Sequence, residues 1–154
     1  MSEFLNSLAA SPIGVWVGES SGYPLLLVLH SIGLALLVGM LVVIDLCVLG
    51  LGAPAMPPGA LRNIMRISWS GLLLAVLSGS LLFVVDGNKY YYSFTFRLKL
   101  TCIVLGAWLA IALSRHLRQS PVRSAGAAVR IAAAASLLCW LGAIMSGRLM
   151  AYVN

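Results

Sequence analysis

Long apolar runs separated by short polar joints dominate the chain. Four such runs cover about residues 23–51, 67–85, 94–113 and 131–153. Each is near the roughly 20 residues that an α-helix needs to cross the hydrocarbon of a bilayer. The joints contain residues that interrupt helices: a Pro/Gly-rich stretch at 53–59, Asp86-Gly87-Asn88, and Pro121 among polar neighbours. Because a segment in lipid must satisfy its own backbone hydrogen bonds, each run is predicted to be a helix.

The first 22 residues differ from these runs. Short apolar groups alternate there with Ser, Asn, Gly and Glu, and Pro12 divides them. This pattern favours one or two short helices lying in the membrane interface. The sequence thus predicts an all-α fold in which residues 1–154 form a single transmembrane domain, a four-helix bundle preceded by short interfacial helices.

Small residues at four-residue spacing predict where these helices touch. The stripes are Ser31, Ala35 and Gly39 in the first run, Gly71, Ala75 and Gly79 in the second, and Ala135, Cys139 and Ala143 in the fourth. Small side chains allow helix backbones to approach closely in lipid, where the hydrophobic effect does not drive association. A compact bundle is expected.

Composition agrees with a membrane location. Apolar residues make up 61% of the 154 residues and charged residues 9%, compared with about 45–50% and about 25% in soluble domains. So few charges cannot cover a water-exposed surface, which excludes a soluble enzyme, and the apolar content excludes a disordered segment. The three cysteines stand apart without a C-x-x-C pair, so buried thiols are expected rather than a disulfide framework.

The distribution of charge predicts the orientation. Ten Lys or Arg and four Asp or Glu give a net charge of +6. The joints after the first and third runs hold basic residues and no acid: Arg62, Arg66, Arg115, Arg118, Arg123 and Arg130. Basic loops stay in the cytoplasm, so both termini are predicted in the periplasm of a bacterial inner-membrane protein. The positive charge therefore reflects topology, and no nucleic-acid partner is expected.

His30 is an ionisable residue inside a predicted span. It lies seven residues into the first run, about 10 Å deep at about 1.5 Å per residue, where such a group costs roughly 2.5–3.5 kcal/mol. Three cations, Arg97, Lys99 and Arg148, lie about one turn nearer the outer surface on the third and fourth runs. This arrangement suits haem b, with His30 as axial ligand and the cations paired with the haem carboxylates.

Copper is the alternative cofactor. Cys102 and Met145 fall at about the depth of His30, and imidazole, thiolate and thioether are suitable ligands for cuprous copper. The other histidine, His116, lies near the opposite face, so a haem with two histidine ligands would require His30 from two copies in a homodimer. Otherwise Met145 is the second ligand of the iron, or that ligand position stays open. In the simplest alternative, His30 bonds to a neighbouring helix and the cations meet lipid phosphates.

Asp45 is the only acid within a predicted span. Arg66 begins the next run after a short joint, so a structural ion pair between these two residues is expected. The alternative is that Asp45 is the proton-coupling carboxylate of a small exporter.

Three motifs resemble those of an uncharacterised family of bacterial four-helix inner-membrane proteins. They are HSIGLALLVG at 30–39 followed by Asp45-Leu46, FRLKL at 96–100, and GRLMAY at 147–152. The resemblance covers nearly the whole chain, implies the four-helix fold, and directs attention to His30, Lys99 and Arg148. The His-x-x-Gly opening, Ser78-Gly79 and the lysine at the start of the third run are more distantly similar to the copper-resistance D membrane family.

The sequence therefore predicts a membrane protein that holds a redox or metal ligand near its outer face, with haem ahead of copper. One alternative is a non-catalytic subunit or assembly partner of a larger membrane complex, which would suit the small-residue stripes and short joints. The other is the proton-coupled exporter. No nucleophile elbow, metalloprotease motif or phosphate-binding loop is present, so any redox activity would be electron transfer. The expected partners are the lipid bilayer and a second copy or a larger membrane complex.

Overall fold

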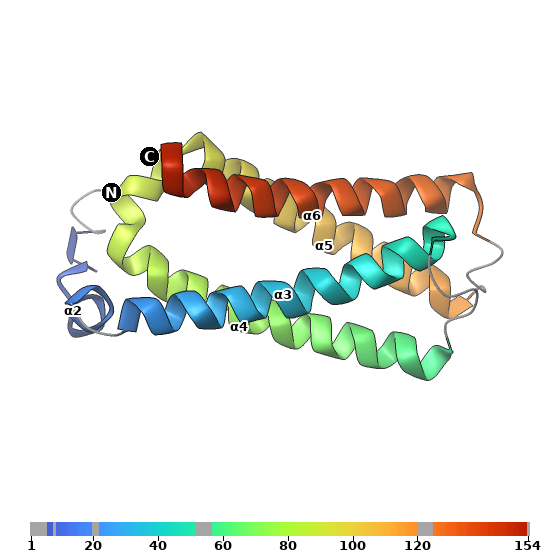
Figure 1. Cartoon of the computed structure of the whole chain (residues 1–154), viewed down its shortest axis with the longest axis horizontal. Coiled ribbons are helices and arrows are strands. Elements are labelled where there is room, and N and C mark those ends of the chain that lie inside the picture. The colour runs from blue at the N-terminus through green and yellow to red at the C-terminus, as the bar shows by residue number, and fades with distance from the viewer. Residues whose placement is uncertain (1–5, 8, 20–21, 52–56, 120–124, 154) are drawn as a thin grey trace.

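The computed structural model describes residues 6–7, 9–19, 22–51, 57–119 and 125–153. The helices in that part are α2 (Pro12–Glu19), α3 (Gly22–Leu49), α4 (Pro58–Tyr91), α5 (Phe94–Gln119) and α6 (Ala127–Val153). The four long helices run antiparallel along the molecule, and α2 lies at the end where α3 begins (Figure 1). The predicted all-α four-helix bundle is confirmed.

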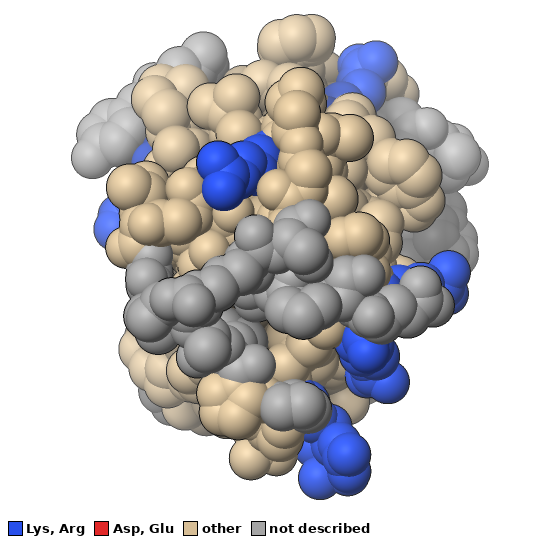
Figure 2. Space-filling view, turned by 90° about the vertical axis from the view of Figure 1, so that its right-hand side faces the viewer, with Lys and Arg blue, Asp and Glu red and all other residues tan. Residues whose placement is uncertain are grey.

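All four long helices are long and apolar enough to cross a membrane. The candidate spans are Gly22–Leu49, Gly59–Val85, Phe94–Arg118 and Ala127–Met150. Because their number is even, α3 begins and α6 ends on the same side. We call this side the terminal end. We call the opposite side, where α4 and α6 begin, the basic end. A view onto the basic end shows Lys and Arg side chains and no Asp or Glu among the coloured residues (Figure 2).

The ends of the helices follow from local residue chemistry. α3 ends at Leu49, and the next residue, Gly50, has a φ of +83° that is accessible to glycine at little cost. The amides of Gly50 and Leu51 bond back to the carbonyls of Cys47 and Leu46, at 3.1 and 2.9 Å, which is the Schellman arrangement of a glycine-terminated helix. α4 begins with proline in its first turn, where the missing amide proton is not needed. α2 begins at Pro12, and the amide of Gly14 donates to Ser11 Oγ at 3.2 Å.

The turn predicted at residues 86–88 is wrong, because α4 continues as a helix to Tyr91. Tertiary contacts account for this extension. Gly18 of α2 lies against Val85, and Phe83 and Tyr90 of α4 stack on Phe96 of α5 at centroid distances of 5.4 and 6.3 Å. These contacts outweigh the turn preference of the Asp-Gly-Asn sequence. Towards this end α4 bends towards the other helix pair (Figure 1).

The bundle consists of two close helix pairs, α3 with α4 and α5 with α6, and contacts between α4 and α5 are sparse. The first pair crosses at Gly33 and Gly71. A Cβ on Gly33 would lie 2.7 Å from the Ala75 amide nitrogen, and one on Gly71 would lie 2.8 Å from the Gly33 carbonyl oxygen. The predicted α4 stripe of Gly71, Ala75 and Gly79 therefore faces α3.

The predicted stripe on α3 is wrong: Ser31, Ala35 and Gly39 are exposed. Nothing lies within 4 Å of a Cβ placed on Gly39. One glycine, Gly33, is sufficient for the backbone crossing, and larger side chains fill the rest of the contact face. The expectation for α6 holds in part, since Ala143 is buried and Ala135 and Cys139 are half-buried.

The apolar core that joins the two pairs lies in the half of the bundle nearer the basic end. All four long helices contribute to it, through the side chains of Leu37, Val38, Leu41, Ile44, Leu61, Met65, Ala110 and Trp140. A second cluster, formed by Val48, Leu113, Ala125 and Ala133, lies still closer to that end. The other half of the bundle contains His30 and Lys99, on opposite helix pairs.

Candidate functional site

The imidazole of His30 lies between α3 and α4. Its Nδ1 is 2.9 Å from the carbonyl oxygen of Ala75 and 3.3 Å from Ser78 Oγ. A carbonyl can only accept a hydrogen bond, so the geometry assigns the proton to Nδ1. The ring lies against Gly79, where a Cβ would approach Cε1 to 2.9 Å. Glycine at this position therefore makes room for the imidazole.

With its proton on Nδ1, His30 carries a lone pair on Nε2. In the described part of the chain, both hydrogen bonds of the ring involve Nδ1, and none involves Nε2. Histidines that bind metals commonly donate their other ring proton to a carbonyl or carboxylate, which fixes the tautomer and the ring direction. The Ala75 carbonyl fixes His30 in this way. The bond to Ala75 therefore fixes the tautomer of His30 and leaves the Nε2 lone pair without a hydrogen bond in the described part of the chain.

Lys99 is the cation whose charge acts on this imidazole. Its side chain extends from α5 along Gly147 of α6, where a Cβ would lie 3.5 Å from Nζ. The ammonium group interacts electrostatically with His30 across the two helix pairs. His30 and Lys99, two of the residues that depth and charge had selected, thus lie on opposite helix pairs within the range of each other's charge.

The remaining predicted site residues lie elsewhere. Cys102 is half-buried with its sulfur against Gly142, between α5 and α6. Met145 is 64% exposed, and Arg97 and Arg148 are also exposed. The guanidinium of Arg97 donates to the carbonyl of Tyr92 at 3.3 Å.

The predicted copper ligands therefore have less geometric support than the haem ligand. Depth along a helix placed Cys102 and Met145 near His30, but rotation about the helix directs Met145 outwards. Within the described residues, no group of three or more His, Cys, Asp and Glu could hold a metal ion. Copper binding by His30, Cys102 and Met145 stays a prediction.

Asp45 does not form the expected ion pair with Arg66. Asp45 is 2% exposed, and its Oδ2 has no hydrogen-bond partner among the described residues. Arg66 is exposed and lines a pocket between α4 and α5. The short joint brings Arg66 close in sequence, but α4 turns this side chain away from α3.

Ser136 of α6 lies near the Asp45 carboxyl. Among the described residues, neither Ser136 Oγ nor Asp45 Oδ2 has a hydrogen-bond partner. One turn further along α6, the buried Trp140 Nε1 also lacks a partner. Sequence reasoning missed Ser136 and Trp140. The available sequence signal was their spacing: residues four apart in a helix share a face, and both carry a polar atom within an apolar helix.

The partners of His30 were also missed in part. Ser78 and Gly79 are visible in the sequence as a small polar pair on the α4 stripe, but the group that fixes the ring is the backbone carbonyl of Ala75. Every residue has a backbone carbonyl, so the residue types in the sequence do not show which carbonyl a side chain will contact.

Comparison with known proteins adds no assignment. The chain matches no protein-family profile, no curated protein and no solved structure at a significant level. The chain is thus characterised by its structure: an all-α protein with four candidate membrane spans arranged as a bundle.

Proposed function

We propose that this integral membrane protein binds a redox or metal cofactor through Nε2 of His30, with haem b ahead of copper. The observation that carries the proposal is the hydrogen bond from Nδ1 to the Ala75 carbonyl. It holds the ring against α4 and leaves Nε2 without a partner in the described part of the chain. The same bond is the contact with a neighbouring helix that the sequence predicts for a purely structural histidine, so the cofactor content measured below distinguishes the two.

Lys99 supports haem rather than a bare metal ion. A cation near a neutral imidazole disfavours a second positive charge, but it favours the carboxylate groups that haem carries. The Lys99 side chain lies along Gly147 on the opposite helix pair, and its charge acts on His30. Arg97 and Arg148, exposed at the same end, would contribute long-range attraction.

In this proposal one chain would hold the haem through His30 alone, because Met145 is directed outwards. His30 of a second copy would be the other histidine available to it. When bound, the haem would supply one-electron chemistry. The residues of this chain would bind it, set its charge environment and exclude water with the surrounding helices.

Absorption spectroscopy tests this proposal. The full-length protein is expressed with a haem precursor, and separately with copper, and purified in mild detergent for visible spectra and metal analysis. We expect a Soret band that His30→Ala abolishes and that His116→Ala, which removes the other histidine, retains. Lys99→Gln should lower the haem content. A wild-type protein with neither haem nor copper, or a His30→Ala variant with an unchanged cofactor content, would refute the proposal.

A second candidate function rests on Asp45. Its buried Oδ2 without a partner is the observation that favours it, because a carboxyl in a span that is not engaged in an ion pair suits proton binding. In this proposal Asp45 couples proton movement to export. Proteoliposomes that report internal pH should show proton entry with the wild type and with Asp86→Asn, but not with Asp45→Asn. Equal proton entry in all three would eliminate the exporter.

A further inference from the structure

A pocket of about 480 Å³ lies between α4 and α5 near the basic end. Four arginines line it, Arg62 and Arg66 from α4 and Arg115 and Arg118 from α5, and no acid does. Within the described residues, no acceptor bonds to these guanidinium groups. The pocket therefore carries concentrated positive charge without an internal counterion.

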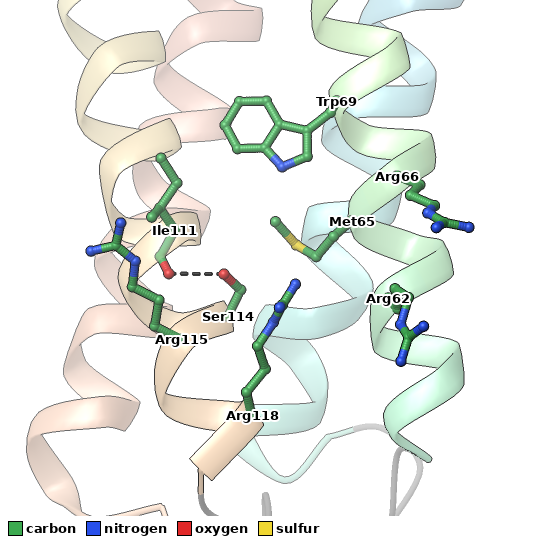
Figure 3. Close-up of a pocket in the computed structure, with 8 residues that line it drawn as sticks. All are labelled: Arg62, Met65, Arg66, Trp69, Ile111, Ser114, Arg115 and Arg118. Atoms are coloured by element: carbon green, nitrogen blue, oxygen red, sulfur yellow. Dashed lines mark hydrogen bonds between the residues drawn. The ribbon is translucent and has the colours of Figure 1, made fainter.

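The side chains differ in direction (Figure 3). Arg118 extends from α5 into the space between the two helices, beside the side chain of Met65. Trp69 reaches across the same space further from the basic end. In this view Arg62, Arg66 and Arg115 point towards the flanks. Arg118 is thus the arginine placed to contact a bound anion, and the other three surround its position with charge.

The two helices that form the walls of the pocket, α4 and α5, both present arginines near the basic end and apolar side chains further from it. Trp69 comes seven residues after Arg62 on α4, and Ile111 comes seven residues before Arg118 on α5. Because the helices are antiparallel, each of these apolar residues lies about 10 Å further from the basic end, at about 1.5 Å per residue. The residues belong to the candidate spans. The pocket is therefore charged at the end of the bundle and apolar at the depth of lipid chains.

We propose that this pocket binds an anionic glycerophospholipid, such as phosphatidylglycerol, with its phosphate at Arg118 and an acyl chain along Trp69 and Ile111. Guanidinium groups bind phosphate oxygens through charge-assisted, often bidentate hydrogen bonds, and basic pockets between membrane helices bind lipid head groups. A free phosphate would leave the apolar wall unused. A zwitterionic lipid would bring its ammonium group close to uncompensated arginines.

Native mass spectrometry of the full-length protein in detergent tests this site, with phosphatidylglycerol and phosphatidylcholine added in turn. We expect bound phosphatidylglycerol in excess of phosphatidylcholine, and a loss of affinity of about fivefold for each arginine removed. Arg115→Gln/Arg118→Gln removes the charge of one wall and Arg62→Gln/Arg66→Gln that of the other. Because all four residues are exposed, both variants should unfold at the wild-type temperature. The matched control is Arg130→Gln, an exposed arginine of α6 outside the pocket.

Three results would overturn the proposal. The first is unchanged phosphatidylglycerol binding in either double variant, which would show that the two walls do not form one site. The second is an equal loss in Arg130→Gln, which would indicate general surface charge. The third is displacement of the lipid by millimolar inorganic phosphate or glycerol phosphate, which would show that the pocket takes free phosphate and that the apolar wall contributes nothing.

Discussion

Replacing Gly33 by alanine tests the close approach of the α3 and α4 backbones. The added Cβ would lie 2.7 Å from the Ala75 amide nitrogen and 2.9 Å from the Gly71 carbonyl oxygen, whereas carbon contacts are favourable at about 3.5–4.0 Å. Both neighbours are backbone atoms of α4, so no side chain can rotate away. The two helices must separate by about 1 Å at the crossing, and overpacking of this kind costs about 1–3 kcal/mol.

Gly39→Ala is the matched control on the same helix. Nothing lies within 4 Å of its added Cβ, so this variant should gain stability through helix propensity, at most about 1 kcal/mol. Propensity contributes similarly at both positions, and the difference between the two variants therefore isolates the contact. We expect Gly33→Ala to have a free energy of unfolding about 1–3 kcal/mol below that of Gly39→Ala.

Titration with SDS in mixed micelles, followed by circular dichroism, measures these free energies. Gly71→Ala should resemble Gly33→Ala. The double variant should lose less than the sum of the two single losses, because helices already separated at one glycine accommodate the second Cβ more easily. If Gly33→Ala and Gly39→Ala unfold with the same free energy, the close crossing of α3 and α4 is refuted.

The same titration checks three further predictions. Trp140→Ala should lower the free energy of unfolding by about 3–5 kcal/mol because the indole is 1% exposed. Trp108→Ala, at 65% exposed, should change it by about 0.5 kcal/mol or less, and similar losses for both would contradict the core assignment. Gly106→Ala should cost about 1–3 kcal/mol and shift the tryptophan fluorescence, since its Cβ would approach Trp140 Cε2 to 3.0 Å; an unchanged emission spectrum would argue against this packing. Asp45→Leu should be neutral or stabilising, because Oδ2 has no partner to lose, whereas a loss of about 3–5 kcal/mol would indicate a broken buried ion pair.

The spans were predictable because hydropathy acts over whole segments. A run of about 20 apolar residues must be helical in lipid regardless of its neighbours, and all four runs are helices in the structure. The helix boundaries were less predictable. The Asp-Gly-Asn sequence at 86–88 favours a turn on its own, but contacts of α4 with α2 and α5 keep it helical.

The direction of side chains around each helix was the main source of error. Counting residues gives depth, at about 1.5 Å per residue, and on that basis it selected His30 and Lys99. It does not give the face that a residue occupies, which depends on where the helices cross. Met145 and Gly39 were therefore expected inside the bundle and are exposed.

Asp45 shows a second limit of sequence reasoning. Arg66, at the start of the next run, was the expected partner, because an acid in a span commonly has a counterion. The structure places Ser136 opposite Asp45 instead, from a helix that follows 82 residues later in the chain. Packing between α3 and α6 brings them together, and no local pattern encodes it.

The pairing of helices that are consecutive in the chain has a consequence for biogenesis. α3 and α4 can close around Gly33 and Gly71 while α5 and α6 are still on the ribosome, since contacts local in sequence form first. The hairpin of α5 and α6 then packs against the hairpin of α3 and α4, which is already inserted in the membrane. Lys99 and the α5 wall of the arginine pocket arrive only with that second hairpin, so both proposed ligands would enter after synthesis of the C-terminal half.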